Sequence, residues 1–160
     1  MSAKHLSLRS NWQFGARVIG DKGETALVSA LAKHLPDHYE ITLKPKKLKV
    51  YGRSRGIILD AVIRNNRTGK KLFLEKKTGN NGGNAHERVY KFLSLPLQEK
   101  VRKDYGTVTK PFFFVFSGKT FQKQKYINEF SLLLKGENYA IMSEDFSNID
   151  AVAQQIMEIV

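Results

Sequence analysis

The sequence predicts an α/β fold in which a mixed central β-sheet is flanked by helices. Segments with helical and strand-like patterns alternate along the chain, and a length of 160 residues suits one domain. The continuous apolar run PFFFVFS at 111–117 is typical of a strand that is covered on both faces. We therefore expect a single domain over residues 1–160, with helices packed on the sheet.

The predicted elements follow from local patterns. Apolar residues at helical spacing predict helices at 21–35, 84–95, 121–134 and 148–160. Short apolar runs predict strands at 39–43, 57–64, 71–77, 111–117 and 139–142. Asn84 would cap the second helix. Asparagine and glycine within 65–69 predict a tight turn that joins the strands on either side of it into a hairpin.

The chain carries a large positive charge. Lys and Arg total 27 against 15 Asp and Glu, a formal net charge of +12. A solvated basic surface is one interpretation of this excess. The other is a polyanionic partner, because neutralising phosphates releases condensed counterions. Together with the motifs described below, the charge favours nucleic acid.

Two absences narrow the functional classes. The chain has no cysteine, which excludes disulfides and thiolate metal sites. No stretch approaches the roughly 18 apolar residues of a membrane span, and the N-terminus lacks the apolar centre of a signal peptide. We therefore expect a cytoplasmic protein with no membrane partner and no small-molecule substrate.

Asp60 and Glu75 are the candidate metal ligands. Each interrupts an apolar strand, where an uncompensated charge is costly, and a hairpin between the two strands would bring them together. Neighbouring carboxylates favour a cation between them, and oxygen ligands favour a hard ion such as Mg²⁺. Lys77 shares a strand face with Glu75 and could stabilise charge at a reacting phosphate. The same pattern also arises by chance from ordinary charged residues at strand ends.

Other polar residues have two interpretations each. Glu24, on the first helix, either suits the helix dipole or lies near the metal. The basic segment 44–55, which contains Arg53 and Arg55, is either a solvated loop or a clamp on backbone phosphates. Lys76 points away from Glu75 and is either solvated or in contact with phosphate. For His86 an exposed position on a helix is favoured over DNA contact.

Residues 83–88 read Gly-Asn-Ala-His-Glu-Arg. With Leu59-Asp60 and Glu75-Lys76-Lys77 ahead of it, this segment resembles the PD-(D/E)xK nuclease superfamily. The closer resemblance is to the GNAxER segment of type II restriction endonucleases related to EcoRI and MunI. It covers residues 56–88, with weaker support from Gly23-Glu24. Leu59 stands where the superfamily pattern has proline, and Lys76 stands where an apolar residue is usual.

The resemblance implies a restriction-endonuclease-like fold and a homodimer that cuts both strands of a short palindrome in double-stranded DNA with Mg²⁺. It implies Asp60 and Glu75 as metal ligands, Lys77 as the catalytic lysine and a role for Glu24 nearby. The residues implied at the DNA are Gly83, Asn84, Ala85, Glu87 and Arg88, with Glu87 bracing Arg88. A site containing AATT is expected, and asparagine can pair with adenine N6 and N7.

Two other functions fit the same residues. A nuclease of the same superfamily, such as a Holliday junction resolvase or a repair nuclease, would cut by DNA structure and not by sequence. A non-catalytic basic module that binds nucleic acid would show no Mg²⁺-dependent cleavage.

Overall fold

The structure of the chain, a computed structural model, describes residues 22–52, 54–79 and 84–160. Its centre is a five-stranded sheet in the order β1-β2-β3-β4-β5. β1, β2 and β3 are antiparallel neighbours, whereas β3, β4 and β5 run parallel. The strands are β1 (Tyr39–Leu43), β2 (Ala61–Asn65), β3 (Lys71–Thr78), β4 (Thr107–Ser117) and β5 (Asn138–Ile141). This arrangement confirms the predicted mixed sheet.

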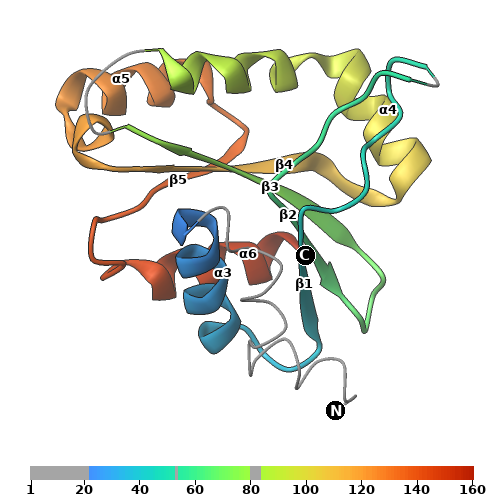
Figure 1. The fold of residues 1–160 in the computed structure, drawn as a ribbon, viewed down its shortest axis with the longest axis horizontal. Helices are drawn as coiled ribbons and strands as arrows, with labels where there is room; N and C mark the ends of the chain where they lie inside the picture. Colours follow the sequence, from blue (N-terminus) through green and yellow to red (C-terminus); the bar gives the residue numbers. More distant parts are fainter. Residues whose placement is uncertain (1–21, 53, 80–83) are drawn as a thin grey trace.

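Helices cover both faces of the sheet (Figure 1). On one face lie α3 (Lys22–His34) and α6 (Ile149–Ile159). On the other lie α4 (Leu95–Tyr105), α5 (Gln124–Leu133) and two 3₁₀ helices, η1 (Ala85–Leu93) and η2 (Lys119–Gln122). Among the residues that the structure describes, none of the helices has the length and apolar character needed to cross a membrane.

β4 supplies the centre of both hydrophobic layers. Phe113 and Val115 pack with the α3 and α6 side of the sheet, whereas Phe112, Phe114 and Phe116 pack with the α4 and α5 side. All five side chains are at most 1% exposed. The phenylalanine run therefore forms a strand that is covered on both faces, as predicted.

Several predicted boundaries differ from the structure, three of them as follows. β2 begins at Ala61 and not at residue 57, because Ile57 pairs in an isolated bridge with Leu48. The helix predicted at 84–95 is the 3₁₀ helix η1, which ends at Leu93. The strand predicted at 111–117 begins at Thr107, four residues earlier.

The helix α4 was not predicted, although its ends carry ordinary signals. The Ser94 side chain accepts a hydrogen bond from the Leu97 backbone N–H at 3.3 Å, and Pro96 occupies the first turn. Gly106 ends the helix in the left-handed conformation, with φ of 67°. Pro96 lies just past the predicted end of the preceding helix and occupies the first turn of the next one, where a proline is well tolerated.

The end of β3 is fastened to η2 by Gly79. The Gly79 backbone N–H donates to the Ser117 carbonyl, and the Gly79 carbonyl accepts from the Thr120 N–H, both at 2.9 Å. A Cβ atom at Gly79 would lie 2.9 Å from Cε2 of Phe121 and 3.1 Å from Cβ of Thr120. These distances leave no room for a side chain at this junction.

We expect Gly79→Ala to lower the free energy of unfolding by about 1–3 kcal/mol, because the added methyl group overpacks the Phe121 ring. Chemical denaturation of the variant and the wild type measures the change. Ala85→Gly, at an exposed residue of the following segment, is the matched control. An unchanged midpoint for Gly79→Ala would show that the junction has room to relax.

Candidate active site

Asp60 and Glu75 lie side by side where β2 and β3 meet. Ala61 is the register partner of Leu74 in an antiparallel pair. Asp60, just before Ala61, therefore adjoins Glu75, just after Leu74. The Asp60 N–H donates to the Leu74 carbonyl at 3.1 Å, and the Lys76 N–H donates to Asp60 Oδ2 at 2.7 Å. Backbone hydrogen bonds from β3 therefore hold both the main chain and the carboxylate of Asp60 beside Glu75.

The Glu75 carboxyl group is buried and electrostatically strained. Its side chain is 10% exposed, and Oε2 has no hydrogen-bond partner among the described residues. Burial raises the pKa of Glu75, and the negative charge of Asp60 raises it further. The hydrogen bond and positive charge of Lys77, and the more distant charge of Lys44, lower the pKa without cancelling the rise.

One lysine faces each carboxylate. Lys77 Nζ lies 2.5 Å from Glu75 Oε1, and Lys44 Nζ lies 3.2 Å from Asp60 Oδ1. Lys44 also donates its backbone N–H to the Asp60 carbonyl at 2.9 Å and has a positive φ of 45°, unusual for a residue with a side chain. Sequence reasoning did not assign Lys44 to the site. Its position directly after the strand that pairs with β2 was the available signal.

The pair of carboxylates fits a hard divalent cation. An unpartnered buried oxygen on Glu75 and the repulsion between two adjacent acids are both relieved by a positive ion. Within 22–52, 54–79 and 84–160 no cluster of three or more His, Cys, Asp or Glu residues could hold a metal. Two carboxylates are enough for a hard divalent ion that keeps its remaining positions for water and substrate phosphate.

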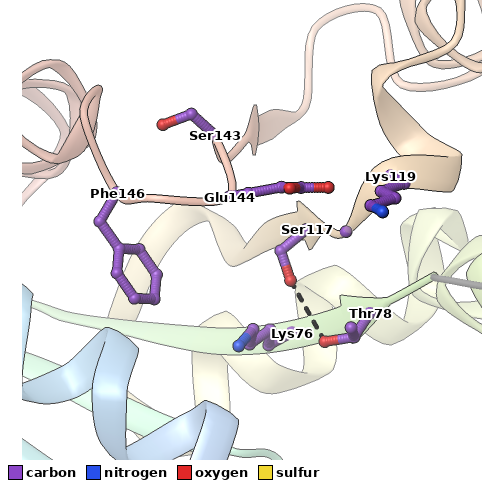
Figure 2. Close-up of a pocket in the computed structure, with 8 residues that line it drawn as sticks. Lys76, Thr78, Ser117, Lys119, Ser143, Glu144 and Phe146 are labelled. Atoms are coloured by element: carbon purple, nitrogen blue, oxygen red, sulfur yellow. Dashed lines mark hydrogen bonds between the residues drawn. The ribbon is translucent and has the colours of Figure 1, made fainter.

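Lys76 leaves β3 on the opposite face from Glu75 and Lys77, because successive strand residues alternate. It lines a pocket of about 500 Å³ at the carboxyl ends of the parallel strands. Figure 2 shows this pocket, with the hydrogen bond between Thr78 and Ser117 across its floor. The lining combines two lysines, three hydroxyl groups, one carboxylate and one ring, from Lys76, Thr78, Ser117, Gly118, Lys119, Ser143, Glu144 and Phe146.

The segment downstream of β3 presents polar side chains to solvent. Asn84, Ala85, Glu87 and Arg88 are exposed. Four of the residues predicted to contact DNA are therefore accessible to solvent. The prediction that the Asn84 side chain caps this helix is wrong: it makes no capping hydrogen bond at the start of η1.

The prediction that His86 is exposed is wrong. His86 is 3% exposed and is buried with Val89 and Phe92 on one side of η1. A 3₁₀ helix has three residues per turn, so residues three apart are aligned. His86 lies three residues before Val89, so it falls on the buried line with Val89 and Phe92. This spacing was the available sequence signal, and the residues on either side of His86 are exposed.

The other predicted residues lie outside the carboxylate pair or outside the described part of the chain. Arg55 is exposed, with its guanidinium 5.9 Å from the centre of the Tyr51 ring. Glu24 lies on the first turn of α3, but its side chain is outside the described structure. Arg53 and Gly83 both lie outside the described residues.

Comparisons with known proteins identify a family for this chain and a solved structure that shares its fold. Residues 50–155 match the model of the family described as type II restriction enzyme MunI. Among solved structures, the chain is similar to MunI restriction endonuclease in complex with cognate DNA, with a TM-score of 0.68 and 22% identity over 92% of this chain and 94% of that one. This likeness shows that the two share a fold.

A weaker likeness is to an XisH family protein from Nostoc punctiforme, with a TM-score of 0.46 and 15% identity over 78% of this chain and 93% of that one. No curated protein matches in sequence. The family match alone spans more than half of the chain, and the chain therefore belongs to the MunI family of type II restriction enzymes.

Proposed function

We propose that this chain is a type II restriction endonuclease that uses Mg²⁺ to hydrolyse both strands of double-stranded DNA at a short palindromic site. The observation that carries the proposal is the pairing of Asp60 with Glu75, with Lys77 on the same strand face, ahead of the exposed residues Asn84, Ala85, Glu87 and Arg88. Family membership and the fold shared with MunI support it.

The reaction would be attack of water on a phosphodiester. The water oxygen bonds to phosphorus, the bond to the 3′ oxygen breaks, and the products are a 5′-phosphate and a 3′-hydroxyl. Asp60 and Glu75 would hold Mg²⁺, which when bound supplies Lewis-acid polarisation of the phosphoryl oxygen. Lys77, whose ammonium group lies beside the Glu75 carboxylate, would neutralise charge that develops on the phosphate or orient the water.

DNA contact would come from the surfaces on either side of this centre. Asn84 and Arg88 are exposed and have the donors that read adenine and guanine edges in the major groove. Glu87 would brace Arg88, and Lys76 in its lysine-lined pocket would contact a backbone phosphate. The net charge of +12 supports binding to the phosphate backbone.

Three finer features complete the proposal. A palindromic site is matched by a two-fold symmetric protein, so the active species would be a homodimer. The GNAxER-like segment suggests a site that contains AATT. Lack of cysteine suits a cytoplasmic enzyme. The family match favours this function over a junction resolvase or a non-catalytic binding module.

We expect the wild type with Mg²⁺ to cut phage DNA into discrete fragments. Asp60→Asn and Glu75→Gln should reduce the rate about a thousandfold or more, because the cation contributes several kcal/mol to transition-state stabilisation. DNA affinity measured in Ca²⁺ or chelator should be kept, since each change removes a negative charge. Gel analysis of timed digests measures the rates.

Asp104→Asn, at an exposed carboxylate paired with Lys100 on α4, is the matched control and should cut normally. Normal cutting by either active-site variant would show that the assigned carboxylates are wrong. Preference for a four-way junction over linear DNA would instead indicate a resolvase.

The raised pKa of Glu75 predicts a link between the active site and stability. Between the usual glutamate pKa of about 4.3 and the raised value, the folded chain binds more protons than the unfolded chain. The stability contributed by this group is therefore present at low pH and lost as pH rises through the folded pKa. Without divalent ions, Glu75→Gln should raise the thermal midpoint at neutral pH and lose that advantage below pH 4.

Glu99→Gln is the control of opposite sign, because the Arg102 hydrogen bond lowers the pKa of the exposed Glu99 carboxyl. It should not raise the midpoint at neutral pH. Differential scanning calorimetry across pH compares the two variants. A lower midpoint for Glu75→Gln than for wild type at neutral pH would contradict the assigned electrostatic cost.

Arg88→Ala should lose discrimination between the preferred site and sites with one altered base pair, by about 1–3 kcal/mol. Arg64→Ala removes one exposed positive charge from β2 and is the matched control. It should weaken binding to all sequences about equally, because a phosphate contact carries no base information. Competition binding on matched oligonucleotides measures the ratio, and equal ratios for the two variants would exclude Arg88 from base reading.

A further inference from the structure

His86 is a buried polar residue inside the segment that is proposed to read the bases. Its ring is 3% exposed and meets the rings of Phe121, Tyr126 and Phe130 edge to face, with centroids 5.6, 5.1 and 5.9 Å away. Phe121 belongs to η2, and the other two rings belong to α5. The His86 side chain thus anchors the segment in an aromatic socket, which is formed by these three rings of the neighbouring helices.

The socket also has a polar contact, made by Glu129 of α5. His86 Nε2 lies 2.9 Å from Glu129 Oε2, and the Tyr90 hydroxyl donates to the same oxygen. Burial, followed by the contact with Glu129, raises the pKa of Tyr90, so this hydroxyl keeps its proton. Two side chains four residues apart on η1 therefore contact a single carboxylate.

The two hydrogen bonds have a defined direction. Because Nε2 faces a carboxylate, that nitrogen carries the hydrogen and donates it. The other ring nitrogen, Nδ1, is buried and has no partner among the described residues. An apolar side chain would fill this space without leaving a nitrogen unsatisfied. The contact with Glu129 is therefore what a histidine adds at this position.

Phe121 connects this socket to the strand that carries the proposed catalytic lysine. The His86 ring contacts Phe121 on one side, and Gly79 approaches the same ring so closely that it excludes a Cβ atom. Gly79 lies two residues after Lys77. Gly79, at the end of the catalytic strand, and His86, in the base-reading segment, therefore contact the same ring, that of Phe121.

We propose that His86, through its contact with Glu129, is a positioning residue that sets the base-reading segment in register with the catalytic strand. The proposal rests on the proposed function. Asn84, Glu87 and Arg88 lie beside His86 in sequence and are exposed, so their placement relative to Lys77 depends on this anchor. Its loss reduces discrimination between sites more than it reduces the capacity to cut.

The test uses His86→Phe, which keeps an aromatic ring and removes the bond to Glu129, and Glu129→Leu, which removes the acceptor. The first measurement is the ratio of kcat/KM for the preferred site to that for sites with one altered base pair. We expect this ratio to fall roughly tenfold in each variant, the scale of one base contact. The double variant should fall no further than Glu129→Leu alone, because that change already removes the contact with His86 together with the Tyr90 hydrogen bond.

Tyr126→Phe is the matched control, since it keeps the ring on His86 and removes a hydroxyl that bonds to no described residue. It should leave the ratio unchanged. A purely structural role would lower the thermal midpoint of His86→Phe without changing the ratio. An unchanged ratio in a variant that still cuts would therefore overturn the proposal.

A second measurement does not depend on cleavage. Hydrogen exchange of the backbone amides in 85–93 should be faster in His86→Phe than in wild type, while amides of β4 keep their rates. Equal exchange rates in 85–93 for His86→Phe and wild type would also overturn the proposed role of His86. If wild-type protein cuts no DNA with Mg²⁺, the proposed function fails, whereas the exchange result still decides whether His86 holds this segment in place.

Discussion

The antiparallel register of β2 and β3 is the constraint on which the candidate site depends. Ala61 faces Leu74, and this pairing sets Asp60 beside Glu75. A shift of one residue would turn Glu75 to the opposite face and separate the two acids. The parallel pairing of β3 with β4, in which Glu75 faces Phe114, prevents such a shift because β3 is bonded on both sides.

This register places two carboxylates where their mutual repulsion and burial destabilise the folded protein. The two carboxylates lie close together, one of them buried with an unpartnered oxygen, and each is faced by a lysine. Natural proteins keep such unfavourable arrangements mainly at functional sites and compensate elsewhere. The compensation here lies in β4, where buried phenylalanines each contribute about 1.5–3 kcal/mol of burial free energy. A cation at the acids would turn their repulsion into binding energy.

β3 also connects the candidate catalytic residues to the segment proposed to read the bases. β3 carries Glu75 and Lys77, passes Gly79 on the Phe121 ring, and leads within a few residues to η1. Because η1 is a 3₁₀ helix, its buried residues His86, Val89 and Phe92 are aligned. Glu87, Arg88 and Lys91 between them are exposed. Packing of the buried side of η1 thus determines how the exposed side chains on its other side are placed.

Much of this protein was determined by sequence alone. Strand alternation and the phenylalanine run predicted the mixed sheet, and the charged interruptions at Asp60 and Glu75 predicted where two acids would meet. These features are local, because period and turn chemistry depend on neighbouring residues. The tertiary structure decided the rest. Burial of His86, the contact of Lys44 with Asp60 and the tight fit of Gly79 against Phe121 join residues that are distant in sequence. The partners in these contacts depend on how separate elements pack, which local patterns do not specify.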